Sequence, residues 1–175
     1  MMKAVIAHSV GLALLLAGCS RTSPEELFSK GQDAHKLKDY PIAIAQYTLL
    51  IENHPDRPEA ETSQFLLATV YNDGTHEYQK AVDAFKTYTH RYPDGKEGPT
   101  ALFMVGYLYN NELRNLDSAA AAYQRFLEKY PDHEMATSAQ FELANLGKSA
   151  DELLPKPVMT DETAEKPASK GKKKK

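Results

Sequence analysis

Hydrophobic positions along the chain form one apolar run near the start and then a long repeating pattern. Residues 4–17 are mostly apolar. Over residues 24–147, apolar side chains recur three and four residues apart, which is typical of amphipathic helices. The same types of position also return at a longer, constant spacing, from Tyr47 to Phe85 and from Phe85 to Tyr123, which we call the repeat interval. This longer register predicts repeated structural units.

Each unit is expected to contain two amphipathic helices joined by a short polar turn. The first helix opens with Ser23, Pro24 and Glu26, a capping-box pattern with proline at the first helical position. Turns inside the units are expected at residues 38–40, 73–74 and 114–115. The predicted units span residues 24–56, 59–94 and 97–132, followed by a capping helix region at 134–154. In that last helix we expect Phe141 and Leu143 to face inward.

The repeated positions carry small residues in the first helix of a unit and an Ala-x3-aromatic pattern in the second. With these positions the chain resembles the tetratricopeptide repeat (TPR) family. The matching positions are Gly31, Ala43, Tyr47, Pro55, Ala68, Tyr71, Ala81, Phe85, Pro93, Gly106, Tyr109, Ala119, Tyr123 and Pro131. The chain departs from the family pattern in having no Trp. Its repeat interval is also longer than the family period of about 34 residues.

This resemblance implies an all-α TPR solenoid of three helix-turn-helix repeats with a C-terminal capping helix. The small residues are needed where the two helices of a unit cross, because a larger side chain would hold the helices apart. Three repeats are about the minimum for a stable stack, and a more polar face must close its end.

The apolar run near the start has the features of a signal peptide at residues 1–18. It follows Lys3 and is too short to span a bilayer, which takes about 20 residues. It ends in Leu-Ala-Gly-Cys at residues 16–19, which resembles the bacterial lipobox. The resemblance implies a lipid on Cys19, a tether at residues 19–23 and, with Ser20 next, the outer membrane of a Gram-negative cell. The alternative is an ordinary signal peptide with a chance cysteine.

Charge divides the chain into an acidic body and a basic tail. The net charge is −8 over residues 20–154 and +4 over residues 155–175. An acidic body argues against nucleic acid as a partner, because phosphate contacts need clustered Lys and Arg. The Lys-rich tail is expected to be disordered. Two interpretations of the tail stay open, namely docking onto an anionic surface and a solvated tail near the acidic body.

Residues with catalytic potential form no known constellation in the sequence. The six His residues lack the spacing of zinc ligands, and the single Cys excludes an internal disulfide. Nucleophile-elbow, phosphate-loop and metalloprotease motifs do not occur. We therefore expect no metal site, no cofactor apart from the covalent lipid on Cys19, and no enzymatic activity.

The lipobox and the TPR units together resemble outer-membrane β-barrel assembly lipoproteins of the BamD/YfiO type. That resemblance implies a membrane-anchored periplasmic scaffold that binds envelope proteins, with a role in outer-membrane protein assembly. The chain also resembles the TPR domain of the Tol-Pal-associated periplasmic coordinator (YbgF/CpoB type), so a division or peptidoglycan-linked role is the alternative. A peptide-binding periplasmic chaperone and an envelope enzyme are further alternatives.

The TPR resemblance also implies where a partner binds, because the first helix of each unit lines the concave wall in that family. The expected groove residues recur at fixed distances from the small residue of each unit: Phe28, Gln32, His35, Phe65, Thr69, Asn72, Phe103, Tyr107 and Asn110. Their rings, amides and hydroxyls suit an extended peptide. The alternative is that the phenylalanines pack the first helix of one unit against that of the next. Tyr107 and Asn110 are expected to be the more exposed members.

Overall fold

Short helices joined by tight turns make up the part of the chain that the computed structural model describes, residues 22–148 and 152. The helices are α1 (Pro24–Lys36), α2 (Tyr40–Asn53), α3 (Pro58–Thr69), η1 (Val70–Gly74), α4 (Tyr78–Arg91), α5 (Gly98–Asn111), α6 (Leu116–Lys129) and α7 (Ala136–Ala144). The predicted signal peptide, Cys19, most of the tether and the tail from residue 155 lie outside the described residues.

Side-chain caps and prolines set where several of the helices begin and end. The Ser23 hydroxyl accepts a hydrogen bond from the backbone N–H of Glu26 at 3.1 Å, which confirms the predicted cap of α1. Helices α2, α4 and α6 each end one residue before a residue that precedes proline: His54, Tyr92 and Tyr130. The ring of the proline disfavours helical backbone in the residue before it, so these helices stop there.

The turns inside the three repeats share one backbone conformation. Lys38, His76 and Arg114 have positive φ angles of 60°, 56° and 52°, and they occupy equivalent positions in the three repeats. The second repeat reaches this turn through the π-helical turn η1, which continues α3 and contains the wide bond from the Thr75 N–H to the Val70 carbonyl. The equivalent Leu113 bonds to the Leu108 carbonyl, so the third repeat also widens its last turn.

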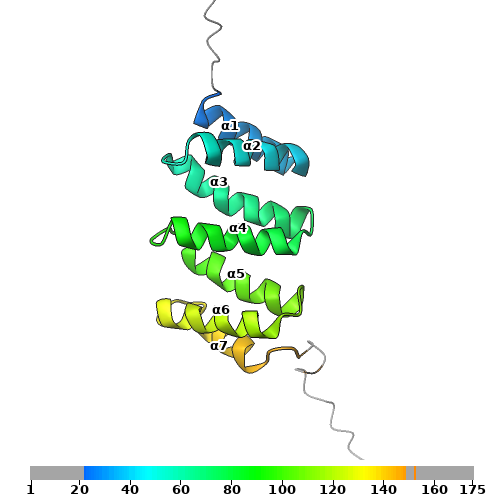
Figure 1. Ribbon diagram of the computed structural model, residues 1–175, viewed down its shortest axis with the longest axis vertical. Helices are drawn as coiled ribbons and strands as arrows, with labels where there is room; N and C mark the ends of the chain where they lie inside the picture. The colour runs from blue at the N-terminus through cyan, green and yellow to red at the C-terminus, as the bar shows by residue number, and fades with distance from the viewer. Residues whose placement is uncertain (1–21, 149–151, 153–175) are drawn as a thin grey trace, which may run out of the picture.

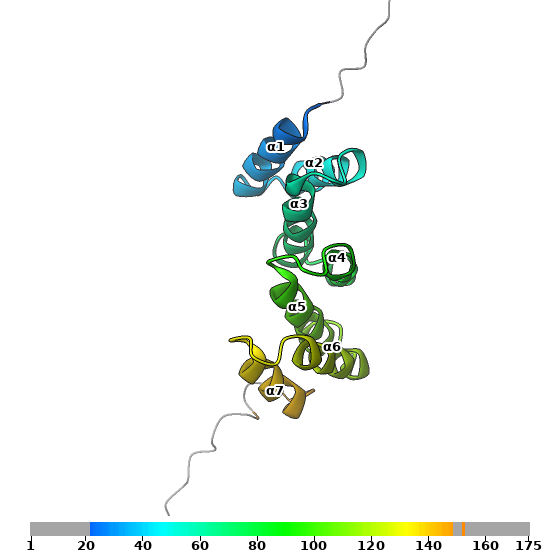
Figure 2. The ribbon, with the colours of Figure 1, turned by 90° about the vertical axis from the view of Figure 1, so that its left-hand side faces the viewer.

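The helices stack in chain order into two layers along one long axis. Figure 2 shows α1, α3, α5 and α7 on one side and α2, α4 and α6 on the other. Successive helices are packing neighbours, and the first and last described helices lie at opposite ends of the stack (Figure 1). The expected all-α solenoid is therefore confirmed.

Aromatic rings from the second helix of a repeat fill the space that the small residues leave on the first. A Cβ atom at Gly31 would lie 2.6 Å from the Tyr47 ring, and one at Gly106 would lie 2.7 Å from the Tyr123 ring. Both distances are too short for a real side chain, so glycine is required there by close packing. In the second repeat Ala68 occupies this position, and the aromatic residue is Phe85.

Tyr88 ties consecutive repeats together. Its hydroxyl donates to the Glu61 carboxylate of α3 at 2.8 Å and accepts from the backbone N–H of Glu97, just before α5, at 3.2 Å. The ring itself is almost fully buried in the cluster that α3, α4, α5 and α6 build together. One side chain of α4 thus contacts the helices that precede and follow it.

The predicted inward orientation of Phe141 is wrong, because this side chain of α7 is 53% exposed. Leu143 does pack, in the cluster that α7 shares with α5 and α6. Phe65 and Phe103, at the equivalent positions, are covered by the second helix of their own repeats. No second helix follows α7 within residues 145–148, so Phe141 has no such partner there.

Candidate protein-interaction site

The phenylalanines predicted for the partner groove mainly hold each repeat together. Phe65 makes edge contacts with Phe85 and Tyr88, at centroid distances of 5.6 and 5.7 Å. Phe103 contacts Tyr123 and Phe126 in the same way, at 5.5 and 6.0 Å. Both phenylalanines therefore pack against the second helix of their own repeat. These ring contacts therefore differ from the alternative prediction, in which the phenylalanines pack the first helix of one unit against the first helix of the next.

Phe28 plays a similar part at the start of the stack. It is half-buried and lies against two hydrophobic clusters, one with Ala34 and Tyr47 and the other with Leu27 and Leu50. Its ring is thus placed between α1 and α2, and part of its surface stays accessible.

The polar groove residues of the second repeat are engaged locally. The Thr69 hydroxyl donates to the backbone carbonyl of Phe65 at 3.1 Å, and the Asn72 amide donates to the Asp73 carboxylate at 2.6 Å. Asn72 lies within η1, and both residues are half-buried. Because both side chains remain partly accessible, their other hydrogen-bonding atoms can still reach a partner.

The first repeat presents a hollow that includes two of the predicted residues. Gln32 and His35 line it together with Lys36, Tyr47 and Leu66, and its volume is about 340 Å³. The His35 ring also makes edge contacts with the rings of Tyr40 and Tyr47, at centroid distances of 6.4 and 6.3 Å. The structure therefore brings an amide, an imidazole and an aliphatic wall together in one concavity.

The two residues expected to be most exposed in the third repeat differ from each other. Tyr107 is 38% exposed, as expected. The prediction for Asn110 is wrong, because only 3% of this residue is exposed. Its amide oxygen accepts from the backbone N–H of Gly147 at 3.0 Å, and its amide nitrogen donates to the Glu142 carboxylate at 3.4 Å. Asn110 attaches α7 and the turn after it to α5, which removes it from any groove.

The TPR-pattern residues differ in how far they are buried. The prolines Pro55, Pro93 and Pro131 lie exposed in the loops between repeats, and the alanines Ala43, Ala81 and Ala119 are fully buried. Tyr71 and Tyr109 are half-buried against the central cluster of α3–α6. The alanines and tyrosines position the helices and expose little surface to a partner.

Two buried tyrosines carry hydroxyl groups with no hydrogen-bond partner in the described part of the chain, Tyr47 and Tyr123. Burial disfavours the phenolate and raises the pKa of Tyr47 to about 12. Burial also raises the pKa of Tyr123, with the nearby Glu142 carboxylate adding to the effect. Both groups act as neutral packing side chains at neutral pH.

Neither a metal site nor a membrane-spanning helix is found among residues 22–148 and 152. These residues include no cluster of His, Cys, Asp or Glu that could hold a metal ion. Likewise, none of their helices is long and apolar enough to cross a membrane.

The arrangement of paired helices defines the class of protein, a solenoid of the TPR type. The TPR domain of Arabidopsis OM64 is structurally similar, with a TM-score of 0.52 and 21% sequence identity. The match covers 69% of this chain and 93% of that domain, and it shows a shared fold. A search of curated protein sequences finds no match.

The sequence of the helical region identifies the family to which the chain belongs. The family model YfiO, described as an outer membrane lipoprotein, matches residues 20–152. Because the match covers most of the chain, this protein belongs to the YfiO outer membrane lipoprotein family. Family and fold together support a protein-interaction scaffold.

A second concavity, which the sequence did not predict, lies between α4 and α6. Lys86 and Arg125 reach over it from these two helices, and side chains of α5 form its floor. The sequence does carry one signal for this site. Neither Lys86 nor Arg125 has a basic residue at the equivalent position of the preceding repeat.

Proposed function

We propose that this chain is a lipid-anchored scaffold on the periplasmic face of the outer membrane that binds a partner in outer-membrane protein assembly. The observation that carries the proposal is the family match, which begins at residue 20, directly after the lipobox cysteine. The TPR fold supports it, because stacked helix pairs present extended surfaces suited to protein partners. The proposed role is binding, without catalysis and without a cofactor beyond the lipid.

The proposed partner surface is the layer of first helices. It combines the exposed ring of Tyr107, the hollow beside Gln32 and His35, and the accessible edges of Thr69 and Asn72. An exposed aromatic ring and nearby amides suit an extended peptide, since the ring takes apolar side chains and the amides pair with peptide groups.

The proposed anchor would hold the first repeat near the membrane. The described chain begins at Thr22, whose backbone carbonyl lies 3.2 Å from the His54 ring nitrogen. Thr22 is the third residue after Cys19, which is a span of about 10–11 Å when fully extended. A lipid on Cys19 would therefore leave α1 and the end of α2 close to the bilayer surface.

Affinity purification of the full-length protein from detergent extracts tests the partner surface. We expect outer-membrane assembly factors to co-purify, and Tyr107→Ala to reduce their recovery by about tenfold because it removes an exposed anchor ring. Leu49→Ala is the matched control, since Leu49 is 42% exposed and lies on α2 in the other layer.

Other outcomes of the same experiment contradict the proposal. Recovery of Tol-Pal components would favour the division coordinator, and recovery of many unfolded proteins would favour a chaperone. Undiminished recovery of assembly factors with folded Tyr107→Ala protein would exclude this ring from the partner surface. The anchor is tested separately: the wild-type intact mass should include lipid on Cys19, and Cys19→Ser should leave an uncleaved precursor or soluble periplasmic protein.

A further inference from the structure

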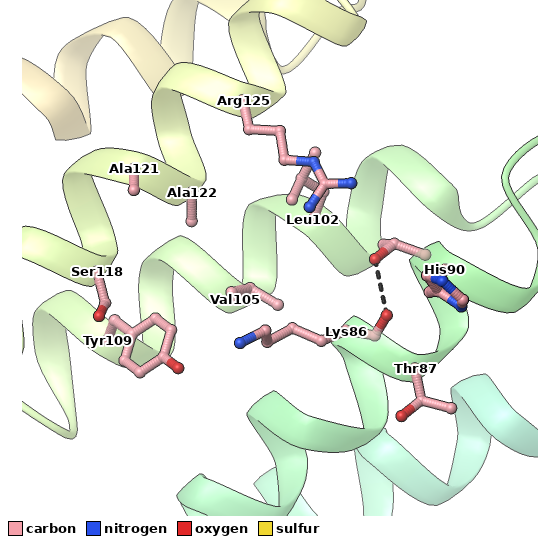
Figure 3. A pocket seen from close by; sticks show the side chains of 11 residues that line it. Lys86, Thr87, His90, Leu102, Val105, Tyr109, Ser118, Ala121, Ala122 and Arg125 are labelled. Atoms are coloured by element: carbon pink, nitrogen blue, oxygen red, sulfur yellow. Dashed lines mark hydrogen bonds between the residues drawn. The ribbon is translucent and has the colours of Figure 1, made fainter.

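The second concavity, termed here the α4–α6 groove, lies between the second helices of the second and third repeats. Its volume is about 530 Å³, within the usual range of ligand sites. The floor consists of the buried side chains Leu102 and Val105 of α5, and the buried Ala122 of α6 adjoins them. Figure 3 shows the groove open between α4 and α6, with α5 beneath it. It belongs to the layer opposite Tyr107, so it is separate from the proposed partner surface.

Two cationic side chains extend over this apolar floor from opposite sides. Figure 3 shows Lys86 reaching in from α4 and Arg125 from α6. Both residues are exposed. Among the described residues, neither the Lys86 ammonium nor the Arg125 guanidinium forms an ion pair, although Lys30, Lys36, Arg57 and Lys80 do. Both cations therefore lie over an apolar floor without a carboxylate partner among the described residues, in a segment with a net charge of −8 over residues 20–154.

The preceding repeat junction lacks these charges, although its helices have the same arrangement. One repeat interval before Lys86 and Arg125, the chain carries Thr48 and Thr87. The position equivalent to the exposed Ala121 is Asp83, and the position equivalent to His90 is Glu52. The repeat fold therefore does not require these two cations, and the equivalent surface carries the carboxylates Asp83 and Glu52, with Lys80 at the position equivalent to Ser118.

The floors of the two junctions also differ. The residue equivalent to Leu102 is Gln64, which is buried and donates to the backbone carbonyl of Ala84 at 3.0 Å. At the earlier junction a polar side chain is thus used to bridge α3 and α4. At the later junction an aliphatic side chain lines an open groove.

We propose that the α4–α6 groove binds an acidic peptide segment of a protein partner, in which carboxylates flank an aliphatic side chain. The aliphatic side chain would cover Leu102 and Val105, and the carboxylates would pair with Lys86 and Arg125. Charge-assisted hydrogen bonds to carboxylates are stronger than neutral ones, and Arg suits a two-pronged contact. The site adds a second partner surface to the scaffold, on the layer of second helices.

Fluorescence anisotropy with the purified full-length protein tests the proposal. The probe is a labelled synthetic peptide containing two Glu-Leu-Glu units, compared with a matched peptide in which Gln replaces each Glu. We expect the Gln peptide to bind at least about tenfold more weakly, because it cannot form the charge-assisted contacts. Raising NaCl from about 50 to about 500 mM should also weaken binding of the Glu peptide severalfold.

Variants locate the binding site. Lys86→Glu combined with Arg125→Glu should weaken binding of the Glu peptide at least about tenfold. Lys30→Glu combined with Lys148→Glu is the matched control, because it changes the net charge equally at exposed positions outside the groove, and it should leave affinity within about twofold. Ala121→Asp copies the acidic residue of the earlier junction and should weaken binding with both cations intact.

The proposal is overturned if the Glu and Gln peptides bind equally, or if the groove variants bind the Glu peptide as tightly as the control variant. Circular dichroism establishes that each variant is folded. Since Ala121 is exposed, Ala121→Asp provides a readout even if the double charge reversal unfolds. If the wild-type protein does not bind the Glu peptide but still recovers assembly factors in a Tyr107-dependent way, this site is overturned and the proposed function stands.

Discussion

At the residue scale, side chains at equivalent repeat positions have different roles because their surroundings differ. Phe103 and Phe141 are separated by one repeat interval and both lie on first helices. Phe103 lies against the rings of Tyr123 and Phe126, whereas Phe141 is 53% exposed. The free energy that each ring contributes to folding depends on the apolar area it buries, so the two positions should respond differently to truncation.

Phe103→Ala should lower the free energy of unfolding by roughly 3 kcal/mol, because it leaves a cavity beside Tyr123. Phe141→Ala should change it by less than about 1 kcal/mol, because little buried surface is lost. Urea denaturation followed by circular dichroism measures both. Equal losses in the two variants would contradict the different environments described for the two rings.

Tyr47 should make the fold sensitive to high pH. Burial raises its pKa in the folded protein to about 12, above an unfolded value of about 10. The folded state therefore favours the neutral phenol, and this contribution to stability is complete below about pH 10 and lost as the pH rises toward 12. Thermal unfolding between pH 9 and about 12 should show a declining melting temperature.

Tyr47→Phe should make the fall in melting temperature at high pH shallower. Some of the fall should remain, because the buried Tyr123 phenol is still present. At pH 7 the substitution should be neutral or slightly stabilising, because the Tyr47 hydroxyl has no hydrogen-bond partner among the described residues. A decline as steep as that of the wild type would contradict the role assigned to this phenol.

At the element scale, the repeats are built from helix pairs whose turns impose a cost. Lys38, His76 and Arg114 adopt left-handed backbone without being glycine. That conformation costs a residue with a side chain roughly 1–2 kcal/mol. The turns persist because the packing of both helices in each pair fixes the geometry between them.

Lys38→Gly should therefore raise the free energy of unfolding by about 0.5–1 kcal/mol, since glycine relieves the strain and the flexibility of the unfolded chain offsets part of the gain. The matched control is Lys36→Gly, the same change two residues earlier in the last turn of α1. It should lower the free energy of unfolding by about 0.5–1 kcal/mol. Changes of the same sign in both variants would argue against strain at Lys38.

At the scale of the whole molecule, stability should be concentrated in the middle of the stack. The central hydrophobic cluster draws residues from α3, α4, α5 and α6, whereas α7 contributes Ala136 and Ala139 as its buried apolar residues. In stacked repeats each unit is stabilised by its neighbours, so the terminal units have fewer stabilising contacts.

Hydrogen exchange measured by mass spectrometry should show the slowest exchange in α4 and α5 and faster exchange in α1 and α7. Asn110→Ala should accelerate exchange in α7 and leave α1 unchanged, because it removes the hydrogen bonds to Glu142 and Gly147. Uniform protection along the stack, or an equal effect of the variant on both ends, would contradict this distribution.

The sequence by itself determined the features that depend on near neighbours and on periodicity. Apolar side chains spaced three and four residues apart predicted the helices, because such side chains share one buried face. The constant spacing of Tyr47, Phe85 and Tyr123 predicted that the helices recur as repeated pairs. The cap at Ser23 was equally predictable, because its partner Glu26 lies within the same turn of the chain.

Only the tertiary structure decided the features that depend on what lies across space. Asn110 was expected on the surface, but it is buried because α7 folds back and supplies Glu142 and Gly147 as partners. Phe141 fits the pattern of Phe65 and Phe103, but it is exposed because no second helix covers it within residues 145–148. The α4–α6 groove arises in the same way: Lys86 and Arg125 belong to different repeats, and helix stacking places them over one floor.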